Sequence, residues 1–72
     1  MNLSEEQAYL AMFSFLETEY LLTSSDEIGG LLGGMSLLPD GSTADPAVKD
    51  QWKEAVARVL RGEVNAALIL TK

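Results

Sequence analysis

The feature that most constrains this chain is its short length combined with the absence of cysteine and histidine. It has 72 residues, and domains of this size commonly need disulfides, a metal ion or a partner subunit for stability. Without cysteine there are no disulfides or thiolate metal sites, and without histidine the commonest metal ligand and general base are missing. We therefore expect one domain over residues 1–72, supported by self-association, with no metal, no cofactor and no enzymatic activity.

Composition points to a protein partner. Apolar residues make up 47% of the chain and the net charge is −6. So large an apolar share in a small body predicts exposed apolar surface, which marks partner sites. An acidic surface repels phosphate backbones and attracts basic proteins, so we expect no nucleic-acid binding. No segment reaches the roughly 18 apolar residues of a membrane span, and the start, MNLSEEQ, lacks a basic region ahead of an apolar stretch. We expect no membrane association and a cytoplasmic location.

Residues 3–22 are predicted to form the first helix. Ser4 and Gln7 fit a capping box, and Glu5 and Glu6 occupy the first turn, where the helix dipole favours negative charge. Apolar residues recur at helical spacing on one face and form a second stripe on another. The first face holds Tyr9, Met12, Phe13, Leu16 and Tyr20, and the second holds Ala8, Ala11, Phe15 and Leu22. A helix this apolar is usually buried on more than one side, either within the domain or against another subunit.

A glycine-rich central block should contain a second, short helix over residues 25–32. Ser24, followed by Glu27, is a second capping-box signal. The presence of the glycine pairs 29–30 and 33–34 in a helix requires an explanation, because glycine within a helix costs about 1 kcal/mol of stability relative to alanine. Close approach of another helix and a left-handed helix stop are the two explanations that we favour. A phosphate-binding loop is disfavoured, since the block has no basic residue and no matching glycine motif.

Turn and cap signals connect this block to the last helix. A short apolar run, which we expect to press onto the core as irregular structure, comes first: Met35, Leu37 and Leu38. The sequence PDGS at 39–42 is typical of a turn. Asp45 and Pro46 suit the N-cap and first position of a helix. The spacing of Asp40, Asp45 and Asp50 does not fit a calcium-binding loop, so these carboxylates are interpreted as turn and cap residues.

The last helix is predicted over residues 46–61, with a clear apolar face. That face holds Val48, Trp52, Ala55, Val56, Val59 and Leu60. We expect Trp52 to pack over the glycine-rich segment, where missing side chains leave room for an indole. Glu54 and Arg58 are spaced for an i,i+4 ion pair, and Gly62 is placed to end the helix.

The segment after this helix, EVNAALILTK, alternates between apolar and other residues, which favours a strand or an extended segment. Val64, Ala66, Leu68 and Leu70 are the candidate self-association residues, because a lone strand needs a partner such as a second copy of the chain. One or two further helical turns are the alternative for this segment.

The run SDEIGGLLGGMSLLPDGSTADPAVKDQW resembles a family of short, uncharacterised bacterial proteins. The resemblance extends over residues 8–60. Some proteins of this general kind are immunity or accessory factors of toxin systems. The resemblance implies an accessory role, and it transfers no functional residue to this chain.

Together these observations predict an all-α fold: a small three-helix domain with a glycine-rich central short helix and a C-terminal strand or extended tail. The function we expect is a non-enzymatic protein-binding or accessory role, immunity-like, with an acidic surface that meets a basic partner. Candidate contacts are Glu5, Glu6, Glu17, Glu19, Asp26 and Glu27. The alternative is a structural homo-oligomer, such as a dimer, with no further partner. Hydrolysis by paired carboxylates is conceivable, but three short helices offer little depth for a sugar.

Overall fold

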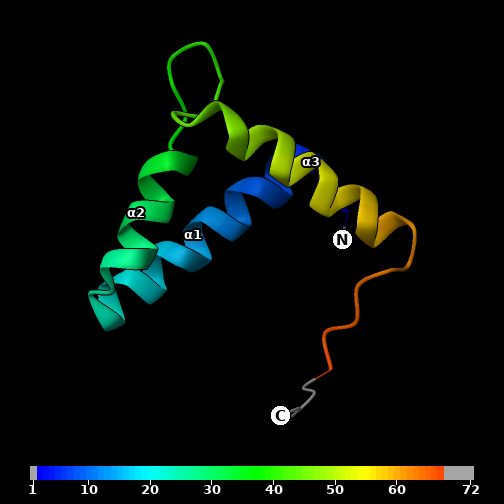
Figure 1. The fold of residues 1–72 in the computed structure, drawn as a ribbon, viewed down its shortest axis with the longest axis horizontal. Helices are drawn as coiled ribbons and strands as arrows, with labels where there is room; N and C mark the ends of the chain where they lie inside the picture. Colours follow the sequence, from blue (N-terminus) through cyan, green and yellow to red (C-terminus); the bar gives the residue numbers. More distant parts are fainter. Residues whose placement is uncertain (1, 68–72) are drawn as a thin grey trace.

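Three helices follow one another in the computed structural model, which describes residues 2–67. Helix α1 spans Glu5–Thr23, α2 spans Asp26–Met35 and α3 spans Pro46–Leu60. Figure 1 shows that α1 and α2 meet at a sharp corner and that α3 returns from the far end of α2 across the N-terminal part of α1. Over residues 2–67 the structure contains no strand beyond one isolated bridge. The predicted all-α, three-helix fold is confirmed.

Helix α1 has the predicted N-cap, Ser4, but it starts two residues later and ends one residue later than predicted. The Ser4 hydroxyl accepts a hydrogen bond from the Gln7 N–H at 3.0 Å, and the Ser4 N–H donates to Gln7 Oε1 at 2.9 Å. This reciprocal pair is the predicted capping box, and it satisfies two N–H groups that have no partner within the helix. At the other end, Ser24 adopts a left-handed conformation with φ of 53° and donates its N–H to the Tyr20 carbonyl at 2.7 Å. The chain turns sharply there because this conformation cannot continue a helix.

Helix α2 starts one residue later and ends three residues later than predicted. Its N-cap is Ser25, whose hydroxyl accepts from the Ile28 N–H at 3.3 Å. The predicted capping box of Ser24 with Glu27 is wrong, because Ser24 already ends α1. The helix then continues through both glycine pairs to Met35, so the predicted left-handed stop at residues 33–34 is also wrong.

One glycine of each pair lets a neighbouring helix approach α2 closely. Close approach of another helix was the other explanation predicted for the glycine pairs. A Cβ atom on Gly34 would lie 3.3 Å from the Asp45 Cβ and 3.7 Å from Val48 Cγ2, where the start of α3 meets the end of α2. A Cβ atom on Gly29 would lie 2.8 Å from Cε1 of the Tyr20 ring. The other two, at positions 30 and 33, face open space, and a side chain added there would meet nothing within 4 Å.

A small hairpin-like loop connects α2 to α3. Leu37 and Thr43 form an antiparallel bridge, and the Leu38 N–H donates to the Ser42 carbonyl at 2.7 Å. The Asp40 carboxylate accepts from the Ser42 hydroxyl at 2.6 Å and from its N–H at 2.9 Å, and these bonds lower the pKa of Asp40. The turn predicted at residues 39–42 is confirmed. The two leucines stay largely exposed, however, so they do not press onto the core as expected.

The start of α3 also matches its sequence signals. The Asp45 side chain accepts from the Ala47 N–H at 3.0 Å, and Pro46 occupies the first helical position. Asp40 and Asp45 therefore act as turn and cap residues. Within residues 2–67, no group of three or more acidic side chains gathers in a way that could hold a metal ion.

Helix α3 ends in a Schellman motif around Gly62, which has φ of 72°. The Gly62 N–H donates to the Val59 carbonyl and the Glu63 N–H donates to the Arg58 carbonyl, both at 3.0 Å. These bonds satisfy carbonyls that the helix leaves unpaired, and the left-handed position favours glycine. The predicted role of Gly62 as the residue that ends the helix is confirmed.

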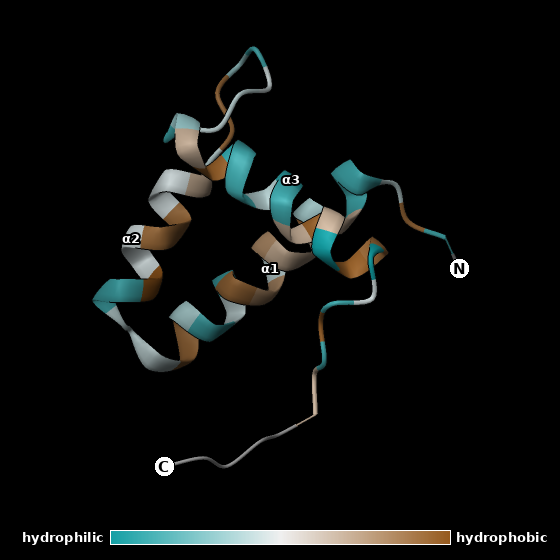
Figure 2. Ribbon diagram, turned by 45° about the vertical axis from the view of Figure 1, so that its right-hand side comes forward, coloured by the Kyte–Doolittle hydropathy of each residue, from teal (hydrophilic) through white to brown (hydrophobic). Residues whose placement is uncertain are grey.

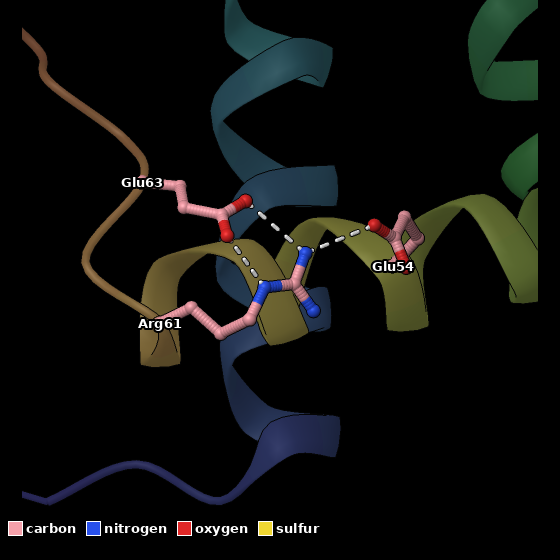
Figure 3. Close-up of polar contacts among 3 residues, drawn as sticks. All are labelled: Glu54, Arg61 and Glu63. Atoms are coloured by element: carbon pink, nitrogen blue, oxygen red, sulfur yellow. Dashed lines mark hydrogen bonds and ion pairs between the residues drawn. The ribbon is translucent and has the colours of Figure 1, made fainter.

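Glu54 pairs with a different arginine from the one that its spacing predicted. Figure 3 shows Arg61 between two carboxylates, with Nη2 3.2 Å from Glu54 Oε1 and Nε 2.8 Å from Glu63 Oε2. The pair expected with Arg58 is not formed, and Arg61 instead links the last turns of α3 to the residue after Gly62. Hydrogen bonds to Glu63 and Glu54 raise the pKa of Arg61. All three side chains are half-exposed, and ion pairs of this kind contribute little to stability.

The core of this fold is small. Over residues 2–67 the buried apolar side chains are Tyr9, which is 7% exposed, and Met35, which is 1% exposed. Within the same range, twelve large apolar residues are exposed. They are Leu3, Leu10, Phe15, Tyr20, Leu21, Leu22, Leu31, Leu37, Leu38, Val59, Leu60 and Val64. Figure 2 shows apolar residues along α1 and α2 and a more hydrophilic α3.

Residues 63–67 follow α3 without regular secondary structure, and all five are exposed. Val64 and Ala66 therefore do not lie in a strand, nor do they form the alternative helical turn. Leu68 and Leu70, the other two residues predicted for self-association, lie outside the described residues.

Candidate protein-binding surfaces

The three helices are joined at one point by Tyr9 and Trp52. The Tyr9 hydroxyl donates to the Met35 carbonyl at 2.7 Å, which ties α1 to the end of α2. The Tyr9 ring meets the Trp52 indole of α3 edge-to-face, with centroids 5.3 Å apart and planes at 81°. Aromatic pairs in this geometry contribute about 0.5–1.5 kcal/mol beyond the area they bury. Trp52 thus anchors the core on Tyr9, and its predicted packing over the glycines is wrong.

This junction includes one buried polar atom without a partner. The Trp52 indole nitrogen Nε1 is shielded from solvent and finds no acceptor among residues 2–67. A buried N–H left unpaired costs about 1–3 kcal/mol. The contact with Tyr9 therefore contributes less net stability than its geometry alone suggests.

An apolar groove opens on one side of the Tyr9–Trp52 junction, with a volume of ≈ 240 Å³. All three helices line it, and none of its residues is charged. The lining residues are Tyr9, Met12, Leu16, Leu31, Met35, Val48, Gln51, Trp52 and Ala55. We call this surface the apolar groove. It lies where the core of a closed three-helix bundle would be, and it is open because α3 crosses α1 near one end instead of lying along it (Figure 1).

From the sequence periodicity we assigned most of the groove residues to apolar helix faces and expected them in the core. Two of these residues are accessible: Leu31 is 48% exposed, and Ala55 is also exposed. Gln51, a polar residue of the groove, is exposed as well. Met12, which is half-buried, and Met35, which is buried, contribute to the groove, so Met35 forms part of its floor. The Met12 side chain is flexible and polarizable, a property common on surfaces that accept apolar partners.

A second, more polar cleft lies on the other side of the same aromatic pair, with a volume of ≈ 310 Å³. Its polar lining comes from two helices of opposite charge: Glu5 and Glu6 at the start of α1, and Lys49 and Lys53 on α3. Its remaining lining residues are Tyr9, Leu10, Leu37, Gly41, Thr43 and Trp52. Because acidic and basic side chains share this cleft, it offers a basic partner no net advantage.

Both hydroxyl groups at this cleft are already engaged in the fold. The Thr43 hydroxyl donates to the Asp45 carbonyl at 2.7 Å, and the Tyr9 hydroxyl donates to Met35 as described above. Burial raises the pKa of Tyr9 above its ordinary value of 10.0, so the phenol stays protonated at neutral pH. A protonated phenol that already donates its hydrogen bond is a poor nucleophile or base.

The six acidic residues predicted as partner contacts do not form one surface. Glu5 and Glu6 lie at the start of α1, beside the mixed-charge cleft. The other four are grouped around the corner between α1 and α2. They are Glu17, Glu19, Asp26 and Glu27. At 1.5 Å per residue, the two groups are about 20 Å apart along α1.

We call the second group the acidic corner. Helical spacing places two of its members beside the apolar groove. Glu19 follows Leu16 by three residues on α1, and Glu27 precedes Leu31 by four residues on α2. The acidic corner therefore borders the end of the groove that lies between α1 and α2.

No helix over residues 2–67 is long and apolar enough to cross a membrane. Comparisons of the chain with protein-family models, curated proteins and solved structures give no match. The apolar groove, the acidic corner and the exposed apolar side chains are the surfaces through which this protein can bind a partner.

Proposed function

We propose that this protein is a non-enzymatic binding protein that takes an apolar segment of another protein into its groove. The observation that carries the proposal is the uncharged groove of ≈ 240 Å³ lined by all three helices. Clefts of this kind between helices commonly accept one face of an amphipathic helix. Filling the groove would complete the core that the three helices leave open.

The negative charge of α1 and α2 supports the proposal of a basic partner. Helices α1 and α2 together carry six carboxylates and no lysine or arginine. Four of these carboxylates form the acidic corner at one end of the groove. A partner helix with apolar residues on one face and basic residues near one end would match both features. Its association would be steered by the net charge of −6 and would weaken as salt screens it.

The chemistry of the two clefts supports the proposal of a non-enzymatic role. The hydroxyls of Tyr9 and Thr43 are engaged in structural hydrogen bonds, and the chain contains no cysteine or histidine. The accessory or immunity-like role implied by the family resemblance belongs to the same class of function. A structural homo-oligomer is the second candidate, and exposed apolar residues on α1 favour it.

Co-purification from a native cell extract, followed by titration of the recovered partner, tests the groove. We expect Leu31→Gln to weaken binding roughly tenfold, because it removes an apolar contact of about 1–1.5 kcal/mol. Leu60→Gln is the matched control, since Leu60 is exposed on α3 and does not line the groove. Trp52 is the only tryptophan and lines the groove, so its fluorescence should change when the groove is filled.

The acidic corner is tested in the same assay. Glu27→Gln should weaken binding at low salt and have less effect at high salt, whereas Asp50→Asn on α3 should have little effect at either. Failure to recover any partner at low or physiological salt would contradict the proposal. Equal losses in the Leu31 and Leu60 variants would place the contact outside the groove.

A further inference from the structure

The side of α1 that faces away from the groove carries a second apolar surface. Tyr9, Met12 and Leu16 line the groove on one side of the helix. Helical spacing places a different set of residues on the opposite side. They are Ala11, Ser14, Phe15, Thr18, Leu21 and Leu22, all exposed, and we call them the outer stripe of α1.

The outer stripe is unusually apolar for a surface that nothing covers within residues 2–67. Phe15 is 63% exposed, Leu21 is 80% exposed and Leu22 is 75% exposed. The stripe contains no charged residue. The hydroxyl of Thr18 already has a partner within the helix, because it donates to the Ser14 carbonyl at 3.3 Å. A helix that is apolar on all sides is normally buried on all sides.

We infer that the outer stripe of α1 is the interface of a symmetric homodimer. Small residues (Ala11, Ser14 and Thr18) run along the middle of the stripe, with Phe15 and Leu22 on one border and Leu21 on the other. A two-fold interface needs projections and hollows on the same patch, because each copy presents an identical surface to the other. The outer stripe supplies both: the large side chains of one copy fit over the small residues of the other.

A second copy is favoured over a different partner for two reasons. The stripe carries no charge that could select a basic or an acidic protein. The acidic corner, in contrast, carries such charges. A domain of 72 residues with only two buried apolar side chains over residues 2–67 also lacks an adequate core of its own. Self-association is the remaining common support for such a small chain.

The area of the outer stripe is enough for a weak dimer. From the exposed fractions of Phe15, Leu21 and Leu22, the outer stripe offers at most about 500 Å² on each copy. The pair would then bury at most about 1,000 Å², which is close to the minimum for a biological interface and in the range of weak association. This dimer leaves the groove free, because groove and stripe lie on opposite sides of α1. Each dimer therefore presents two apolar grooves, whatever occupies them.

Sedimentation velocity across a range of protein concentrations tests the inference. We expect a dimer for the full chain and a dissociation constant at least roughly tenfold higher for Phe15→Glu, because the two-fold axis places the new charge in the interface twice. Leu60→Glu is the matched control: it makes the same charge change at an apolar residue that is 81% exposed on α3. A monomeric full chain overturns the inference, as does a dimer that Leu60→Glu dissociates and Phe15→Glu does not.

Cysteine cross-linking gives a second test that does not depend on how well Phe15→Glu folds. The chain has no cysteine, so Ala11→Cys, Ser14→Cys and Thr18→Cys each introduce a single thiol on the stripe. A residue close to the two-fold axis lies near its own copy, within reach of a disulfide. We expect at least one of the three to form a disulfide-linked dimer rapidly, and Leu60→Cys to form none at the same concentration. Cross-linking of Leu60→Cys alone overturns the inference.

Salt dependence separates this dimer from binding at the acidic corner. Helix α1 carries four glutamates and no basic residue, so two copies repel each other and added salt should tighten the dimer. Binding of a basic partner should weaken under the same conditions. A dimer that loosens as salt is added would contradict an interface made of outer stripes.

Discussion

Replacing Gly30 or Gly33 with alanine should stabilise this protein by about 1 kcal/mol at each position. Both glycines lie within α2, where glycine loses more backbone entropy on folding than alanine does. At both positions an added Cβ atom meets nothing within 4 Å, so the gain is not offset by a clash. For a domain of this size, 1 kcal/mol raises the melting temperature by roughly 4–8 °C.

Urea denaturation followed by far-UV circular dichroism measures the effect at a fixed protein concentration. Gly34→Ala is the internal control, because its Cβ would lie 3.3 Å from the Asp45 Cβ. The Asp45 N–H is also held by the Gly34 carbonyl at 3.0 Å, so the start of α3 cannot easily move away. We expect the control to gain clearly less than Gly30→Ala and Gly33→Ala, or to lose stability.

Two results would refute this reasoning. If Gly30→Ala and Gly33→Ala destabilise the protein, their side of α2 is covered by another surface or α2 is not helical there. If the Gly34 control gains as much as they do, the close approach of α3 to α2 is not as described. The double variant Gly30→Ala with Gly33→Ala should be more stable than either single variant. Because the two positions are i,i+3 neighbours on α2, the difference from the sum measures their coupling.

Three further predictions test single features of the fold by the same denaturation assay. Tyr9→Phe should cost about 1–1.5 kcal/mol by leaving the buried Met35 carbonyl without its donor. Because burial raises the pKa of Tyr9 above 10.0, the wild-type free energy of unfolding should be steady below that pH and fall above it; this fall should be smaller in Tyr9→Phe. Ser24→Gly should stabilise the protein, since Ser24 has φ of 53°, which favours glycine. Ser25→Ala should destabilise the protein by about 1 kcal/mol through loss of the α2 cap. Effects of the same sign in the two variants would contradict the cap assignments. Gly41→Ala should cost about 1–2 kcal/mol because φ is 85° there, and an unchanged urea midpoint would argue against that turn.

The helix ends were the most predictable part of the fold. The capping pair Ser4–Gln7, the start at Asp45 and the stop at Gly62 depend on residues only a few positions apart, which the sequence displays directly. The second cap was placed one residue early because Ser24 and Ser25 are both good N-caps. Only the left-handed conformation of Ser24 decides between them, since it assigns that residue to the end of α1.

Contacts between helices were less predictable. Periodicity places Trp52 on an apolar face, but it cannot specify that the indole meets Tyr9, 43 positions earlier in the chain, in place of the nearer glycines. Periodicity likewise put Val59 and Leu60 on that face, and both are exposed because the last turn of α3 extends beyond α1 (Figure 1). The residues of the groove were identifiable as apolar, but the crossing of α3 over α1 is what leaves them open.

The placement of charge on α1 explains why this helix shows little amphipathic pattern. A helix that served only a monomeric core would carry its polar residues opposite Tyr9. Helical spacing instead places Glu6, Glu17 and Glu19 along the borders between the groove side and the outer stripe. The glutamates therefore separate two apolar faces, and the side opposite Tyr9 carries Ala11, Phe15, Thr18 and Leu22. This pattern is typical of a helix covered on two sides, as in the dimer that we propose, whereas residues 2–67 of one chain cover only one side of α1.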